Sequence, residues 1–127
     1  MFSSVEVFLR ELSELTEEFF PDGRLETVYA RLETVSLCLV IKPSLFIDIY
    51  LNVPNSRFDF TLIEGGKRIF GYDNLKSWHY HPLSNPEEHV ECDSPSLKHI
   101  VRETASVIAA YRRRSKMRTK SPDKKRR

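Results

Sequence analysis

Hydrophobic side chains change their spacing along this chain. Across residues 4–19 they recur every three or four positions, which places them on one face of an α-helix; they are Val5, Phe8, Leu9, Leu12, Leu15 and Phe19. Ser3 and Glu6 fit a capping box at the start of this helix, and Pro-Asp-Gly at 21–23 ends it. From residue 24 to residue 73, β-branched and aromatic residues alternate with polar ones, which predicts antiparallel strands.

Two turn sequences divide the strand region into a meander. Pro-Asn-Ser at 54–56 separates two β-rich runs, and Glu-Gly-Gly-Lys at 64–67 predicts a tight hairpin. Pro43 separates an earlier strand from its successor. The predicted strands are 34–41, 45–53, 57–63 and 68–72.

The segment before these strands has two interpretations. Arg-Leu-Glu-Thr-Val occurs at 24–28 and again at 31–35, and the offset of seven residues fits a helix. The same letters fit a β-hairpin, since threonine, valine and tyrosine favour strands. We favour the strand interpretation and leave the helix open.

A second helix is predicted after a loop. Ser94 fits its N-cap and Pro95 its first position, and the helix continues past Tyr111. The chain therefore predicts an α+β domain over residues 1–114, with an N-terminal helix, an antiparallel meander of four or five strands and a C-terminal helix packed on one sheet face. Both helices would cover that face and leave the other open. Residues 115–127 have no apolar periodicity and predict a disordered basic tail.

The charge is distributed unevenly along the 127 residues. Residues 112–127 contain ten Lys or Arg and one acid, a net +9, so the whole-chain value of +2 leaves −7 for residues 1–111. Such a tail can displace counterions from phosphates. The residues predicted to contact nucleic acid there are Arg112, Arg113, Arg114, Lys116 and Arg118. A solubilising role, or contact with an acidic partner, stays open.

Composition also limits the cellular setting. No apolar run approaches the roughly 20 residues that span a bilayer, and no secretion signal is visible, so we expect a cytoplasmic protein with no membrane partner. Cys38 and Cys92 lie in different contexts, which argues against a disulfide.

Three of the four histidines lie within eleven residues, at His79, His81 and His89. Histidine is the side chain whose unperturbed pKa allows a change of charge near neutral pH. Asp73 and Arg68 lie just upstream. This is the part of the chain from which chemistry can be argued.

These residues also carry a resemblance to a known family. Arg68, Tyr72-Asp73-Asn74, His79-x-His81-Pro82, His89 and the closing helix resemble the TumE-like family of small prokaryotic proteins, over roughly residues 22–110. The resemblance implies a toxin of a type II toxin–antitoxin pair, with ribonucleolytic activity. It also implies a helix-turn-helix antitoxin as protein partner and RNA as substrate.

Metal-independent RNA cleavage needs a group that takes the 2′-hydroxyl proton, a group that protonates the leaving 5′-oxygen, and a cation near the phosphate. Histidines suit the two proton roles and arginine suits the phosphate. On extended segments His79 and His81 point to one side, and Arg68 shares a side with Tyr72. We predict one catalytic hollow without cofactor or metal, formed by Arg68, Tyr72, Asp73, His79, His81 and His89. Trp78 and Tyr80 would stack on bases.

Three other interpretations remain open. His79, His81, His89 and Cys92 could supply four ligands to a structural zinc ion, although their spacing matches no common zinc module. The histidine loop could instead be polar structure whose imidazoles cap backbone groups, with Trp78 packing in the core. The chain could also be a non-catalytic module that binds protein or nucleic acid through the open sheet face.

Overall fold

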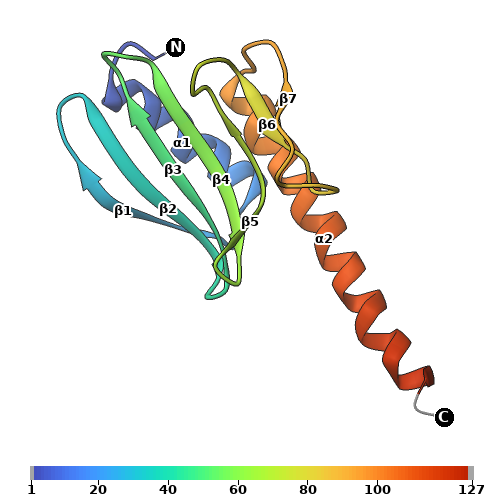
Figure 1. The fold of residues 1–127 in the computed structure, drawn as a ribbon. Coiled ribbons are helices and arrows are strands. Elements are labelled where there is room, and N and C mark those ends of the chain that lie inside the picture. Colours follow the sequence, from blue (N-terminus) through green and yellow to red (C-terminus); the bar gives the residue numbers. More distant parts are fainter. Residues whose placement is uncertain (1, 126–127) are drawn as a thin grey trace.

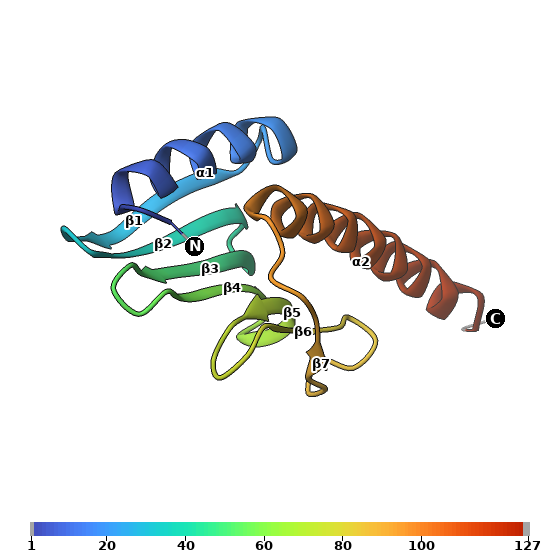
Figure 2. The ribbon, with the colours of Figure 1, turned by 90° about the horizontal axis from the view of Figure 1, so that it is seen from above.

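Strands form one antiparallel sheet whose order follows the chain, and two helices cover one face of it (Figures 1 and 2). This computed structural model describes the backbone of residues 2–125 and the side chains of residues 2–115. Within that part the helices are α1 (Val5–Phe19) and α2 (Leu97–Lys125). The strands are β1 (Arg24–Ala30), β2 (Thr34–Lys42), β3 (Leu45–Asn52), β4 (Arg57–Glu64), β5 (Lys67–Asp73), β6 (His79–His81) and β7 (Val90–Glu91).

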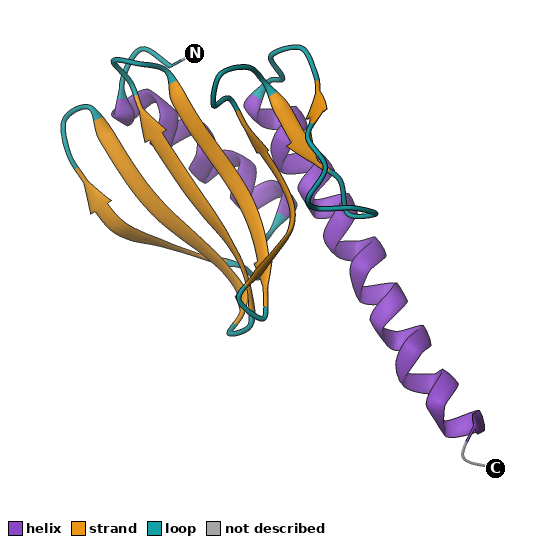
Figure 3. Cartoon of the chain, in the orientation of Figure 1, coloured by secondary structure: helices purple, strands orange, loops and turns teal. Residues whose placement is uncertain are grey.

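The α+β class and the meander are confirmed, with one correction to the number of strands. The sheet has seven strands in the described residues where four or five were predicted, because β6 and β7 are three and two residues long and too short to show an alternating pattern (Figure 3). Residues 24–35 form β1 and the start of β2, so the strand interpretation of the repeated Arg-Leu-Glu-Thr-Val is confirmed.

The core lies between the sheet and the two helices. Alternate residues of β2 to β5 point toward the helices and are buried, among them Leu37, Ile47, Phe60 and Phe70. The helices add a further apolar layer: Val5, Phe8, Leu12, Leu15, Leu97, Ile100, Val101 and Ile108 are all buried. In the part of the chain that the structure describes, no helix covers the other sheet face, which carries polar side chains such as Asp48 and Asp59 (Figure 2).

Both helices begin at a different residue from the one predicted. The Ser4 hydroxyl accepts a hydrogen bond from the Val7 backbone N–H at 3.1 Å, so Ser4 is the N-cap and the predicted capping box of Ser3 and Glu6 is wrong. In α2 the Ser96 hydroxyl accepts from the His99 N–H at 3.0 Å, two residues later than the predicted Ser94 cap. In each case a serine one or two positions further along the chain provides the cap.

The α2 helix extends beyond the sheet (Figure 1). Its backbone is helical to Lys125, across the predicted boundary between residues 114 and 115. Arginine and lysine have high helix propensity, and an existing helix extends at lower cost than a new one forms. In the described part of the chain, no helix is both long enough and apolar enough to cross a membrane. Cys38 and Cys92 are both free thiols, as expected.

Candidate functional site

A β-bulge in the hairpin of β4 and β5 decides which residues reach the open face. Leu62 lies opposite Phe70, but its neighbour Ile63 lies opposite Arg68, so Ile69 is an extra residue in β5. The extra residue reverses the alternation of faces. Arg68 therefore points to the open face with Ile63, whereas Phe70 and Tyr72 point to the core. The prediction that Arg68 and Tyr72 share a side is wrong for this reason.

The three clustered histidines converge on that open face. His79 and His81 lie opposite Asp73 and Gly71 of β5, and His89 precedes β7 where that strand pairs with β6. The His79 and His89 rings are stacked, with centroids 4.7 Å apart. The His81 ring lies edge-on to both, at 5.1 Å from His79 and 4.5 Å from His89. The prediction that these imidazoles meet is confirmed.

Asp73 holds two of these rings together. Its Oδ1 accepts a hydrogen bond from the Leu75 N–H at 3.0 Å, which fixes the carboxylate against the following loop. Its Oδ2 lies 3.1 Å from His79 Nε2 and 3.3 Å from His81 Nε2. These two distances are consistent with the predicted role of Asp73 in orienting an imidazole.

Backbone carbonyls hold the other nitrogen of the same two rings. His79 Nδ1 donates to Ser77 O at 2.9 Å, and His81 Nδ1 donates to Pro86 O at 3.0 Å. A carbonyl oxygen only accepts, so each Nδ1 carries a hydrogen and each neutral ring has its lone pair on Nε2. Both rings are thus fixed in orientation and tautomer.

Burial differs among the three histidines. His81 is 2% exposed and His79 is 7% exposed, whereas His89 is exposed to solvent. Burial, followed by the charge of Arg68, lowers the pKa of His81 despite its contact with Asp73. His81 is therefore the ring that the fold shields most from solvent, and His89 is the imidazole that solvent reaches.

The histidines line a hollow of about 540 Å³, which we call the histidine hollow. Its wall also contains Arg57, Asp59, Thr61, Arg68, Asp73, Leu75, Lys76, His79, His81 and His89. Arg57 Nη2 donates to both carboxylate oxygens of Asp59, at 2.8 and 2.9 Å. Arg68 and Lys76 are exposed, so two cationic side chains stand at the edge of the hollow next to the imidazoles. A hollow with such an edge suits an anionic group.

Sequence reasoning missed Arg57, Asp59 and Lys76. Arg57 and Asp59 come from β4, and only the register between β4 and β5 places them beside the histidines. Lys76 has a positive φ of 69°, in the loop before β6. The sequence predicted a strand at 57–63, but not which residues of other strands would lie beside it.

Asn74, the second residue of the Asp-Asn pair, does not contact the histidines but forms hydrogen bonds to the turn between β3 and β4. Its Oδ1 accepts from the Phe58 N–H at 2.8 Å and its Nδ2 donates to Ser56 O at 2.6 Å. Ser56 has a positive φ of 57° in the turn between β3 and β4. Asn74 thereby holds the loop after β5 against that turn, directly beside the residue that contacts the histidines.

The structure does not bring Tyr72 to the histidine hollow. Its ring is buried on the helix side, and its hydroxyl donates to Glu103 Oε1 at 3.1 Å and lies 3.3 Å from His99 Nε2. Burial and the nearby Glu103 carboxylate raise the pKa of Tyr72, which keeps the phenol protonated. His99, for which the sequence suggested no role, belongs to this contact between sheet and α2.

Trp78 and Tyr80 also face away from the histidines. They alternate with His79 and His81 along the chain, so they point to the core side. The Trp78 ring lies 6.0 Å from Phe58, and the Tyr80 ring lies 5.6 Å from Tyr72. Their predicted role as stacking surfaces for bases lacks the required geometry, and core packing accounts for both.

Cys92 is separate from the cluster as well. Its backbone N–H donates to Trp78 O at 3.1 Å, and its side chain packs against the core. Burial raises the pKa of its thiol. The predicted zinc set is therefore incomplete, but in the described residues His79, His81 and His89 still have donor atoms within 4.8 Å of one another.

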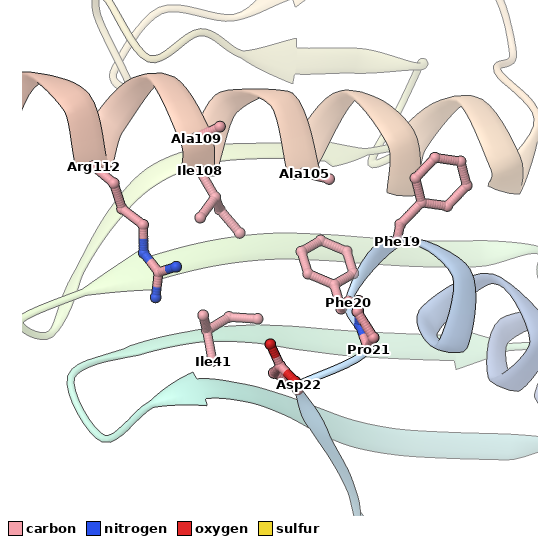
Figure 4. Close-up of a pocket in the computed structure, with 10 residues that line it drawn as sticks. Phe19, Phe20, Pro21, Asp22, Ile41, Ala105, Ile108, Ala109 and Arg112 are labelled. Atoms are coloured by element: carbon pink, nitrogen blue, oxygen red, sulfur yellow. The ribbon is translucent and has the colours of Figure 1, made fainter.

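Two further regions lie apart from the histidine hollow. Arg112, Arg113 and Arg114 are exposed on α2, away from the histidine hollow, whereas the Lys116 and Arg118 side chains lie outside the described residues. A separate hollow of about 360 Å³ lies between the end of α1, Ile41 of β2 and α2 (Figure 4). It is mostly apolar, with Phe20 and Ile108 in its wall and Arg112 at its edge, and offers no cluster of groups for proton transfer.

The fold and the site define a class: a helix-covered antiparallel meander that carries a histidine–aspartate cluster on its open face. No protein-family model, curated protein or solved structure matches the chain. The arrangement of the site itself is therefore the basis for inferring a function.

Proposed function

We propose that this protein cleaves RNA at the histidine hollow, as the toxin-like member of a toxin–antitoxin pair in the cytoplasm. The observation that carries the proposal is the convergence of His79, His81 and His89 on Asp73 next to Arg68 and Lys76. The resemblance of the same residues to the TumE-like family supports it. A helix-turn-helix protein is the partner that this resemblance suggests.

The chemistry requires two proton transfers at one phosphate. The 2′-oxygen forms a bond to phosphorus as its proton passes to a neutral imidazole, and the bond from phosphorus to the 5′-oxygen breaks as an imidazolium donates a proton. The products are a 2′,3′-cyclic phosphate and a 5′-hydroxyl. His89 is exposed and can reach the substrate, with His79 stacked beneath it. Arg68 and Lys76 would hold the phosphate.

The exposed ring gives the sharpest test. The full-length protein, purified and assayed in EDTA, should cleave an unstructured RNA and leave cyclic phosphate ends. The substitution His89→Ala should lower the rate by about 100-fold or more, since proton transfer by a positioned side chain contributes about 10²–10⁴-fold. The matched control is His99→Ala, which removes the fourth histidine, on the other side of the sheet, and should keep the wild-type rate.

A second function has its own supporting observation. Two of the three imidazoles are nearly buried, as in a cluster that holds loops together rather than one that meets a substrate. The chain would then be a non-catalytic module that binds protein or nucleic acid through the open sheet face. Absence of cleavage by the wild-type chain, or equal rates for His89→Ala and His99→Ala, would reject the ribonuclease and favour this alternative.

A further inference from the structure

The donor atoms of the histidine cluster are arranged as in a metal site. His79 and His81 each have Nδ1 held by a backbone carbonyl, which leaves Nε2 as the coordinating atom. Histidines that bind metals commonly have their second nitrogen held in this way, which fixes the ring and the tautomer.

The contact with Asp73 adds a further donor atom. Both Nε2 atoms face the same carboxylate oxygen, at 3.1 and 3.3 Å. Two ring nitrogens and one carboxylate oxygen thus point at one place, where a bound cation could contact all three. Two ligands of a tetrahedral zinc ion, with bonds of about 2.0 Å, are about 3.3 Å apart. The observed separations thus suit a shared ion.

His89 supplies a further donor on the solvent side. Its ring lies within 4.7 Å of the other two ring centroids, and the donor atoms of the three histidines lie within 4.8 Å of one another. Imidazole nitrogens favour zinc, copper or nickel over magnesium or calcium, which prefer oxygen ligands. Arg68 opposes a second positive charge here, but its side chain is exposed and can turn toward water.

We propose that the histidine hollow binds one divalent transition-metal ion, with Zn²⁺ as the best fit, through His79 Nε2, His81 Nε2, Asp73 Oδ2 and the His89 ring. Such a set is a closed tetrahedral site. The binding itself does not depend on the proposed function. Its consequence rests on that function: the ion occupies the ring nitrogens that proton transfer needs, so zinc inhibits RNA cleavage.

Metal binding is tested first, without RNA. The full-length chain is treated with EDTA, dialysed, and titrated with Zn²⁺ by calorimetry, and Co²⁺ is added separately for its visible spectrum. We expect one ion per chain, a tetrahedral cobalt spectrum and a higher unfolding temperature with zinc. No binding at micromolar zinc would overturn the site.

Substitutions of single histidines distinguish the loss of a metal ligand from the loss of a structural hydrogen bond. Asparagine places its amide nitrogen near the Nδ1 position, so His79→Asn and His81→Asn keep the bond to the carbonyl and lose Nε2. Each should weaken zinc binding by about 100-fold or more. His89→Ala, at an exposed position, should also weaken it, whereas His99→Asn should not. Equal affinity in all four variants and the wild type would overturn the assignment of ligands.

A cleavage assay then distinguishes the two proposals. Cleavage in EDTA that stops with one equivalent of zinc supports both. Zinc binding by a chain that never cleaves RNA leaves the metal site in place and rejects the ribonuclease. Cleavage that continues with zinc bound, or that requires zinc, overturns the inhibition.

Discussion

The placement of Tyr72 on the helix side leads to a quantitative prediction for the substitution Tyr72→Phe. This change removes one hydroxyl that donates to Glu103 Oε1 at 3.1 Å and leaves the buried ring in place. A hydrogen bond to a charged group contributes about 1.5–3 kcal/mol. The Glu103 side chain is 36% exposed and can be hydrated after the change, so we expect a loss of about 1–2 kcal/mol in the free energy of unfolding.

Thermal and urea unfolding would measure this loss. For a chain of this length, 1 kcal/mol corresponds to about 4 °C in Tm, so Tyr72→Phe should lower Tm by about 4–8 °C. Tyr80→Phe is the matched control, because that neighbouring ring also faces the core side and its hydroxyl has no hydrogen bond to the described residues. Its Tm should change by less than about 2 °C.

The same variant tests where Tyr72 points. Because its ring is on the opposite face of β5 from Asp73, Tyr72→Phe should keep the wild-type zinc affinity and rate of RNA cleavage. A variant with unchanged stability and lost cleavage or zinc binding would refute the placement. It would mean that the phenol reaches the histidine hollow, as the sequence alone had suggested.

Three further outcomes follow from other contacts. Above about pH 10 the tyrosine of the unfolded chain ionises, whereas buried Tyr72 stays protonated because its pKa is raised. The free energy of unfolding of the wild type should therefore fall more steeply with rising pH than that of Tyr72→Phe. Urea unfolding should show a difference in slope of up to about 1.4 kcal/mol per pH unit. Asn74→Ala should cost about 2 kcal/mol in the same assay, since two hydrogen bonds to the β3–β4 turn are lost; an unchanged midpoint would contradict this. Ending the chain after Ser115 should weaken RNA retention and flatten its salt dependence in filter binding, whereas equal slopes would exclude the tail from RNA contact.

Much of the fold could be predicted from residue patterns. The helix spacing from Val5 to Phe19, the Gly65-Gly66 turn and the alternation in β3 and β4 each specify local structure with little ambiguity. Gly65 and Gly66 both have positive φ, which is why the hairpin could be placed before the structure was known. β6 and β7 could not be predicted, since strands this short form only against a neighbour.

The site could be predicted only in part, and the limit has a definite cause. His79 and His81 share a side because two residues separate them, and Asp73 lies opposite His79 in the register. The side of the sheet on which Arg68 lies could not be predicted, because it depends on the bulge at Ile69 and no local sequence pattern marks that bulge. Trp78 and Tyr80 were assigned by residue type, although the same alternation that joins the histidines places these rings on the opposite side.

The extra residue at Ile69 also bears on how such a protein can change through descent. Loss of its codon would make Arg68 the direct neighbour of Phe70, and simple alternation would still place the guanidinium on the open face, opposite Ile63. A deletion of three nucleotides at this position would therefore leave a cation beside the imidazoles, so the site tolerates a hairpin that is one residue shorter.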